Sequence, residues 1–278
     1  MIAMLAFHLL AISSSWYTVA AFTPHRVPSG VTLSIPFPTQ LHVEKNSNLP
    51  QQQGPTLYGS QGSRSPLINW GALEIHVPMQ MGNLSKNPHP FGQIPCLIDD
   101  NNVIVFESGA ILQYLYSNSA IRLQDSHARQ AAILSWIVWA NASLDPICFL
   151  SNDGRVYDTG LRKPNRRIDT VNELLSKQEF LIAEGGFSLA DVAVASYLLY
   201  VLQFFPDVDL TQWPHLVRYM KRCASREAYG KAFGARVQAF LISGLDAMIN
   251  QEVEDDDLED DGNGGDSGQI KKKIMGIF

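Results

Sequence analysis

The stretch "PFGQIPCL", residues 90–97, places a Gly-Gln-Ile turn directly before a proline and an apolar strand pattern. Proline cannot donate to a sheet ladder, so a strand that opens on Pro95 needs an explanation. If the bond between Ile94 and Pro95 is cis, a feature found in tight turns, the backbone of Ile94 faces outward. An extended peptide can then pair with that backbone as an added strand. The stretch therefore predicts a peptide-binding edge of a sheet.

The segments around this turn predict the order strand, helix, strand, hairpin and helix. Strands are expected at residues 56–58, 77–81, 96–98 and 103–106, with an Asp- and Asn-rich turn joining the last two. One helical pattern opens at Ser63 and another at Glu107 and Ser108. This is the layout of a thioredoxin-like α/β domain, which we expect over residues 56–118.

Helical patterns continue through residues 119–250 and predict an all-α domain. Helices are expected at 126–142 and around 168–175. Ser188 and Asp191 precede an almost wholly apolar run at the spacing of a capping box. We expect that run to form a buried helix.

Three motifs in the first domain point to a known family. They are "LYGSQGSRSPL" at 57–67, "PFGQIPCL", and "VFESGAILQYL" at 105–115. Together they resemble the glutathione-binding domain of the cytosolic glutathione transferase superfamily, and the resemblance covers about residues 56–240. It implies a thioredoxin-like domain followed by an all-α domain, assembled as a homodimer. The implied activity is conjugation of the glutathione thiolate, as co-substrate, to electrophilic, mostly hydrophobic small molecules, as in detoxification.

The resemblance also implies which residues bind glutathione. Gln93, Ile94 and Pro95 would meet its cysteinyl unit. Ser108, at the start of a helix, is suited to an anionic group because of the helix dipole and the free N–H groups there. Glu107 adds an acceptor for an ammonium group. Glu107 and Ser108 together therefore suit the zwitterionic end of the γ-glutamyl unit.

Ser63 is the residue that the resemblance implies as catalytic, since serine-type members of the family carry a serine at this position. A thiol with a pKa of about 8.5 is only a few per cent thiolate at neutral pH. A hydroxyl donor at a helix N-terminus stabilises the thiolate and lowers that pKa. Ser60 and Ser65 are alternatives, and Ser63 could instead only cap the helix.

Residues 82–89 are shorter than the corresponding family loop, which often supplies a basic contact to the glycyl carboxylate. Lys86 or His89 would have to take that place. The alternative to an enzyme is a non-catalytic binding or scaffold protein similar to the gamma subunit of the translation elongation factor complex, which carries a similar "VFES" motif.

Composition excludes several other classes of protein. Beyond residue 250, nine acidic and three basic residues account for the whole net charge of −6, so the preceding body is formally neutral. A neutral body offers no basic face for nucleic acid. The three cysteines form no C-x-x-C pair, and the histidines form no metal-binding cluster. We therefore expect neither a disulfide framework nor a bound metal.

Both ends of the chain differ in sequence pattern from the body between them. Residues 1–21 resemble a signal peptide, and residues 22–55 resemble a transit peptide. The junction "VAAFTP" resembles the bipartite presequences of algae with complex plastids, which predicts a plastid location. Secretion is the alternative. Residues 251–278 are expected to form a disordered acidic tail. The apolar run at 2–12 is too short to span a bilayer. No stable membrane insertion of the mature chain is expected.

Overall fold

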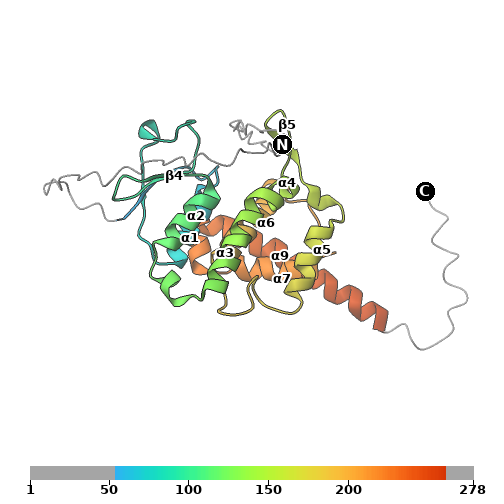
Figure 1. Ribbon diagram of the computed structural model, residues 1–278. Coiled ribbons are helices and arrows are strands. Elements are labelled where there is room, and N and C mark those ends of the chain that lie inside the picture. Colours follow the sequence, from blue (N-terminus) through green and yellow to red (C-terminus); the bar gives the residue numbers. More distant parts are fainter. Residues whose placement is uncertain (1–53, 261–278) are drawn as a thin grey trace, which may run out of the picture.

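The computed structural model describes residues 54–260, with side chains described up to Gln251. The predicted signal segment, nearly all of the predicted transit segment and the end of the acidic tail lie outside these residues. Figure 1 shows a small sheet with α1 and α2 at one end of the molecule and the remaining helices beside them. The elements are β1 Thr56–Tyr58, α1 Ser65–Glu74, β2 Gln80–Met81, β3 Cys96–Ile98, β4 Ile104–Phe106, α2 Ser108–Ser117, α3 His127–Trp139, α4 Asp145–Cys148, β5 Leu150–Asn152, β6 Arg155–Asp158, α5 Arg166–Leu175, α6 Leu189–Phe204, α7 Pro214–Ala224, α8 Glu227–Phe233 and α9 Ala235–Asp260.

The four-stranded sheet has the strand order β2-β1-β3-β4. β1 pairs in parallel with β2, while β3 lies antiparallel to both β1 and β4. A parallel pair requires a crossover, which α1 supplies, and the antiparallel pair is closed by the short turn after Ile98. Sheet and helices together confirm the predicted thioredoxin-like domain followed by a helical domain; the second domain is not all-α, because it also carries the hairpin β5–β6.

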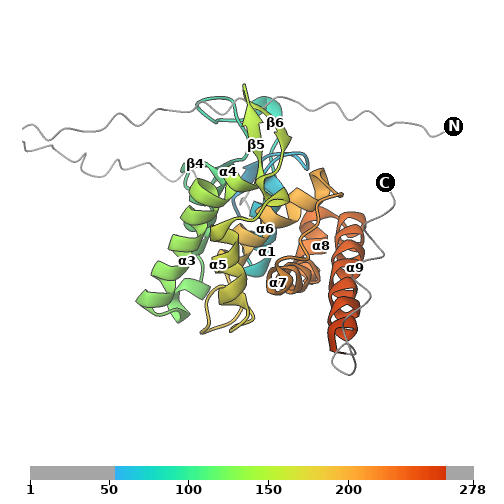
Figure 2. The same cartoon turned by 90° about the vertical axis from the view of Figure 1, so that its right-hand side faces the viewer.

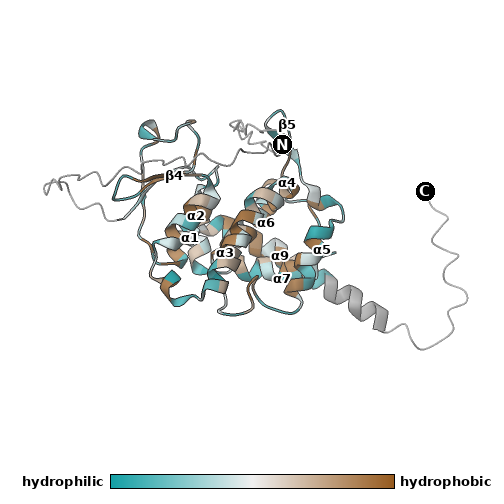
Figure 3. Ribbon diagram, in the orientation of Figure 1, coloured by the Kyte–Doolittle hydropathy of each residue, from teal (hydrophilic) through white to brown (hydrophobic). Residues whose placement is uncertain are grey.

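The helix α6 forms the centre of the all-α domain, and fourteen of its sixteen residues are buried. Figure 3 shows apolar segments on α3 and α6 inside the helical layer. The predicted capping box is present at its N-terminus, where Ser188 Oγ accepts from the backbone and Asp191 accepts from the N–H of Ser188 at 2.8 Å. A helix that is apolar all round must be buried, and this one is.

The predicted helix at 126–142 is interrupted by a π-helical turn. Ser126 caps α3, which runs regularly to Trp139, and a π turn at Ala140–Leu144 then leads into α4. The combined helix His127–Cys148 is long and apolar enough to cross a membrane by length and composition alone. Because α3 packs against α6 and α2, it acts here as a helix of the bundle.

Two elements differ from the sequence expectation. The hairpin β5–β6 was not predicted; it turns through Asp153 and Gly154, both at positive φ, and Figure 2 shows it projecting beyond α4. The last helix, α9, continues to Asp260, into the segment expected to be disordered from residue 251. Helical hydrogen bonds are local, so an acidic run that follows a stable helix can extend it.

A side-chain contact fixes the β3–β4 turn to α2 and gives a first prediction. The hydroxyl of Tyr114 donates to the carboxylate of Asp99. This bond raises the pKa of Tyr114 to about 12. Partial burial works against ionisation of Asp99, but bonds from Tyr114 and the turn backbone outweigh it and lower the pKa of Asp99.

We expect Asp99→Asn to return the pKa of Tyr114 toward about 10. A raised tyrosine pKa stabilises the folded state below about pH 10, the pKa in the unfolded chain. This stabilisation is lost as the pH rises through the pKa of Tyr114 in the folded state. A pH titration of ring carbon resonances measures this, and Tyr114→Phe assigns the signal. An unchanged titration in Asp99→Asn would show that the contact does not set the Tyr114 pKa.

Candidate functional site

Three loops leave the sheet at the same end. The register places Tyr58 opposite Cys96, and Cys96 opposite Phe106. The loop after β1, the loop before β3 and the start of α2 therefore meet at one edge, because each borders one of these three residues. These loops carry every site residue expected from the sequence: Ser63, Gln93, Ile94, Pro95, Glu107 and Ser108.

Glu107 and Ser108 form the junction between β4 and α2. Glu107 is exposed and has a φ of 68°, an uncommon backbone conformation for a residue other than glycine. Such conformations persist where the surrounding structure imposes them, and they cluster at ligand sites. Ser108 is the first residue of α2 and is buried. Glu107 thus lies exposed directly before the N-terminus of α2, a position that favours a negative charge.

The Ile94–Pro95 bond is cis, as the sequence argument required for an outward-facing turn. Strand pairing begins at Cys96, so Gln93 and Ile94 precede the ladder. The carbonyl oxygen of Gln93 accepts a bond of 2.8 Å from Asn87 Nδ2. The turn is therefore held by the preceding loop.

Ser63 lies in a cluster of serines at the start of α1. It is buried, and its Oγ lies 2.8 Å from the carbonyl oxygen of Ser60 and 2.7 Å from Ser65 Oγ. The N–H of Ser65 also donates to Ser63 Oγ at 3.1 Å. The Ser63 hydroxyl is therefore engaged within its own loop, and it must rotate to donate to a ligand. The helix itself begins at Ser65, two residues later than expected.

An arginine that the sequence reasoning missed lies beside this cluster. Arg64 pairs with Asp145 at the start of α4, and its guanidinium lies 4.8 Å from the ring centre of Phe149 and 4.6 Å from that of Tyr197. Burial outweighs the attraction of Arg64 and raises the pKa of Asp145. Arginine over aromatic faces gains cation–π stabilisation. This Arg64 cluster ties the first domain to the second next to Ser63.

Two tyrosines of α6 contact the expected site residues directly. The hydroxyl of Tyr200 donates to the carbonyl oxygen of Ser63 at 2.9 Å. The hydroxyl of Tyr197 donates to Asn141 Oδ1 at 2.9 Å, and the same oxygen accepts from Ser108 Oγ at 3.0 Å. Burial raises the pKa of both tyrosines, which keeps both hydroxyls protonated and able to donate. The sequence signal for the contacts of this helix was a pair of polar residues four apart in a largely apolar pattern: Asn141 bonds Ser108 and Tyr197, and Asp145 pairs with Arg64.

Neither basic residue of the shortened loop, Lys86 or His89, is held in a position to contact a ligand carboxylate. His89 is buried, its ring centre 4.9 Å from that of Phe106, and its Nδ1 accepts from the N–H of Phe91 at 3.0 Å. This leaves the imidazole packed against aromatic rings. Lys86 is exposed. Of the two, only Lys86 is free to reach toward a ligand without rearrangement of the core.

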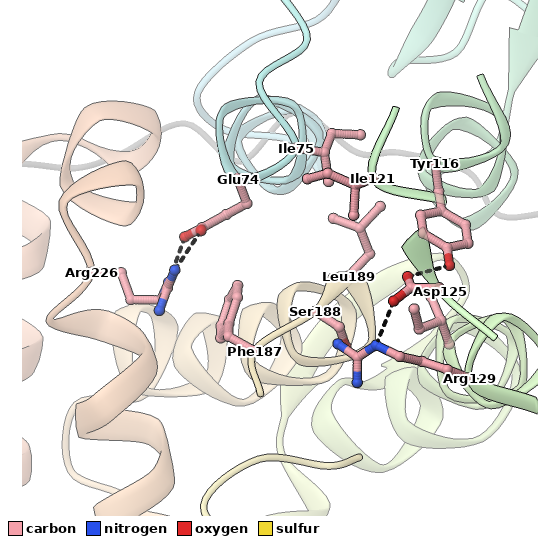
Figure 4. A pocket seen from close by; sticks show the side chains of 11 residues that line it. Glu74, Ile75, Tyr116, Ile121, Asp125, Arg129, Phe187, Ser188, Leu189 and Arg226 are labelled. Carbon is pink, nitrogen blue, oxygen red and sulfur yellow. Dashed lines mark hydrogen bonds and ion pairs between the residues drawn. The ribbon is translucent and has the colours of Figure 1, made fainter. Parts of the chain in front are cut away.

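A pocket of about 110 Å³ lies at the other end of α1 (Figure 4). Its charged groups are already matched: Arg226 forms two bonds of 2.6 and 2.7 Å to Glu74, and Arg129 lies 2.9 Å from Asp125. Ten residues of helix separate the ends of α1 by about 15 Å. This pocket is lined by residues of both domains and is separate from the sheet edge near Ser63.

Metal ligands do not gather in the part of the chain that the structure describes. Among residues 54–260 no group of three or more His, Cys, Asp or Glu residues is placed to hold a metal ion. Cys96, Cys148 and Cys223 are buried free thiols.

The geometry agrees with two family models. The model described as "Glutathione S-transferase, N-terminal domain" matches residues 77–117, and that described as "Glutathione S-transferase, C-terminal domain" matches residues 129–227. The chain belongs to the glutathione S-transferase superfamily. The N-terminal match begins after the loop that carries Ser63, so it includes Gln93, Ile94, Pro95, Glu107 and Ser108 but not the serines of that loop.

Curated relatives of this superfamily member are distant in sequence. A glutathione S-transferase-like protein of Aspergillus aculeatus is 27% identical over 188 residues, covering 60% of this chain and 87% of the relative. Glutathione S-transferase aclG of Aspergillus oryzae is 29% identical over 160 residues, covering 51% and 72%.

Solved structures agree with the fold. A theta class glutathione S-transferase from Xanthomonas axonopodis pv. citri with glutathione bound has a TM-score of 0.52 at 21% identity, covering 66% of this chain and 98% of that one. Glutathione S-transferase-I bound with lactoylglutathione has a TM-score of 0.53 at 26% identity, covering 65% and 98%. The thioredoxin-like domain and the helical domain of this chain are thus those of a glutathione S-transferase.

Proposed function

We propose that this protein is a glutathione transferase that conjugates the thiolate of glutathione to electrophilic, mostly hydrophobic small molecules. The observation that carries the proposal is that the segments bearing Ser63, Ile94, and Glu107 with Ser108 leave the sheet next to the paired residues Tyr58, Cys96 and Phe106. Glutathione-bound structures among the fold relatives support the choice of ligand.

Each part of the site has a task in this proposal. The backbone of Ile94 would pair with the cysteinyl unit, beside Gln93 and Pro95, while Glu107 and the start of α2 would bind the γ-glutamyl end. The Ser63 hydroxyl would turn from the Ser60 carbonyl to donate to the sulfur. Stabilising the thiolate lowers the pKa of the thiol and increases the fraction that is nucleophilic. The electrophile would approach from the aromatic rings around Arg64.

One observation favours a second candidate, a non-catalytic glutathione-binding or scaffold protein. The Ser63 hydroxyl already has both a donor and an acceptor role within its loop. A protein that only binds has no need of a freely turning hydroxyl. Turnover by the wild type separates the two candidates.

The binding test uses calorimetric titration of the purified protein with glutathione. We expect the wild type to bind, and Glu107→Gln to bind about tenfold more weakly because a charge-assisted bond to the ammonium group is lost. Asp100→Asn, the same change at an exposed residue of the β3–β4 turn, is the matched control and should bind like the wild type. A wild type that binds no glutathione at millimolar concentration would rule out the transferase and leave the scaffold protein.

We also propose a homodimer and a plastid location. Exposed apolar side chains on β4 and α3, namely Ile104, Leu134 and Val138, support a self-association surface. Residues 1–55 support delivery to the plastid, and the secretory pathway is the alternative.

A further inference from the structure

Two Asn-x-Ser sequences occur in the chain, one beginning at Asn83 and the other at Asn141. This sequence is the acceptor for N-linked glycosylation in proteins that enter the secretory pathway. Residues 1–21 resemble a signal peptide, which would bring the chain into the lumen of the endoplasmic reticulum on the way either to the plastid or to secretion. The surroundings of the two asparagines decide which of them can carry a glycan in the folded protein.

Asn83 lies in the loop after β2 and is exposed. It caps the short turn at Leu84–Lys86, where its Oδ1 accepts from the N–H and from the hydroxyl of Ser85, each at 3.0 Å. Because a backbone N–H can only donate, Oδ1 is the amide atom that faces Ser85. The other amide atom, Nδ2, forms no hydrogen bond with the described residues. An N-linked glycan is attached to Nδ2, so the atom that would carry it is available.

The side chains next to Asn83 in the sequence leave apolar surface exposed. Met81 is 56% exposed and Leu84 is 48% exposed. Exposed apolar side chains that lie close together favour association with other proteins. An N-linked glycan is bulky and hydrophilic and increases solubility. A glycan on Asn83 would therefore shield apolar side chains that the fold does not bury.

Asn141 is held by hydrogen bonds at both atoms of its amide. Its Nδ2 lies 2.9 Å from the carbonyl oxygen of Ile137. Its Oδ1 accepts from Ser108 Oγ at 3.0 Å and from the Tyr197 hydroxyl at 2.9 Å. A glycan on Nδ2 would replace the bond to Ile137 and separate α2 from the helical domain. The folded protein therefore requires that Asn141 stay unmodified.

We propose that Asn83 carries an N-linked glycan and that Asn141 does not. The donor is an oligosaccharide linked to a lipid diphosphate. A bond forms between Asn83 Nδ2 and C1 of the first sugar, and the bond between C1 and the diphosphate oxygen breaks. The lipid diphosphate leaves with the electron pair of that bond, and Nδ2 loses one proton to a base of the transferring enzyme. This inference goes beyond the proposed activity and rests on the proposed signal peptide.

The experiment is expression of the full chain, with its own residues 1–55, in eukaryotic cells, followed by purification of the folded protein. Release of N-linked glycans by an amidase in heavy-oxygen water converts each modified asparagine to a labelled aspartate, which mass spectrometry of peptides locates. We expect the label at Asn83 and none at Asn141. The amidase should also increase the mobility of the wild type on a denaturing gel.

Three variants test the assignment through the same gel shift. Asn83→Gln should abolish the shift. Ser85→Ala keeps Asn83 but removes the hydroxyl of the acceptor sequence, so it should abolish the shift as well. Asn141→Gln is the matched control and should keep the shift of the wild type. Loss of the shift in Asn141→Gln alone, or label at Asn141 of the folded wild type, would overturn the assignment.

The glycan and the proposed activity fail separately. A wild type that shows no gel shift and no labelled aspartate overturns the glycan at Asn83 and leaves glutathione binding and conjugation untouched. A wild type with the glycan that binds no glutathione removes the transferase and leaves the assignment of Asn83 intact.

Discussion

Asp191→Ala is expected to lower the free energy of unfolding by about 3–5 kcal/mol, from the cost of leaving buried donors without acceptors. The carboxylate is fully buried and accepts from the N–H of Leu181 at 2.9 Å and from that of Ser188 at 2.8 Å. The hydroxyls of Ser188 and Tyr219 also donate to it, each at 3.2 Å. One side chain therefore caps α6, closes the preceding loop and contacts α7.

Urea unfolding of the purified protein measures this effect. Asp191→Asn retains one acceptor oxygen but turns an NH₂ group toward a backbone N–H, so we expect most of the loss to remain. Glu173→Ala, which removes an exposed carboxylate paired with Lys177, is the control and should change stability by less than about 1 kcal/mol. A loss of similar size in Asp191→Ala and Glu173→Ala would show that α6 does not depend on its cap.

Ser63→Ala is expected to lower the turnover number for conjugation about 100-fold, the cost typical of removing one donor that stabilises a developing anion. Glutathione binding should change little, because in the proposed site other residues bind the γ-glutamyl end and the cysteinyl backbone, and Ser63 contacts only the sulfur. The pH profile should also move. Without the donor, the pKa of the bound thiol rises toward about 8.5, so activity extends less far into the neutral range.

The neighbouring serines are the matched controls for this variant. Ser65→Ala disturbs the same hydrogen-bond cluster, since Ser65 Oγ lies 2.7 Å from Ser63 Oγ and accepts from the N–H of Ser60 at 3.2 Å. A loss in Ser63→Ala alone assigns the role to Ser63. Equal losses in Ser63→Ala and Ser65→Ala indicate damage to the loop, and a loss in Ser60→Ala alone moves the role to Ser60. Full activity in all three variants would remove serine activation from the mechanism.

Predictions from sequence succeeded where the interactions are local. The capping box needs residues three apart, and Ser188 and Asp191 form it. The "PFGQIPCL" and "VFES" motifs each determine a turn within a few residues, and both turns are present with a cis proline and a strained Glu107. The π turn at Ala140–Leu144 was not predicted. A π turn adds one residue to a helical turn, and this leaves the spacing of apolar residues along α3 nearly unchanged.

The sequence by itself determined the family fold, the buried central helix and the positions of the residues at the sheet edge, because each depends on short-range pattern and turn chemistry. Tertiary structure alone decided the partners of those residues. Arg64 meets Asp145 across 81 positions, Tyr200 meets Ser63 across 137, and Asn141 meets Ser108 across 33. Such contacts form only when the two domains pack together, and nothing in either segment alone specifies which hydroxyl will find which acceptor.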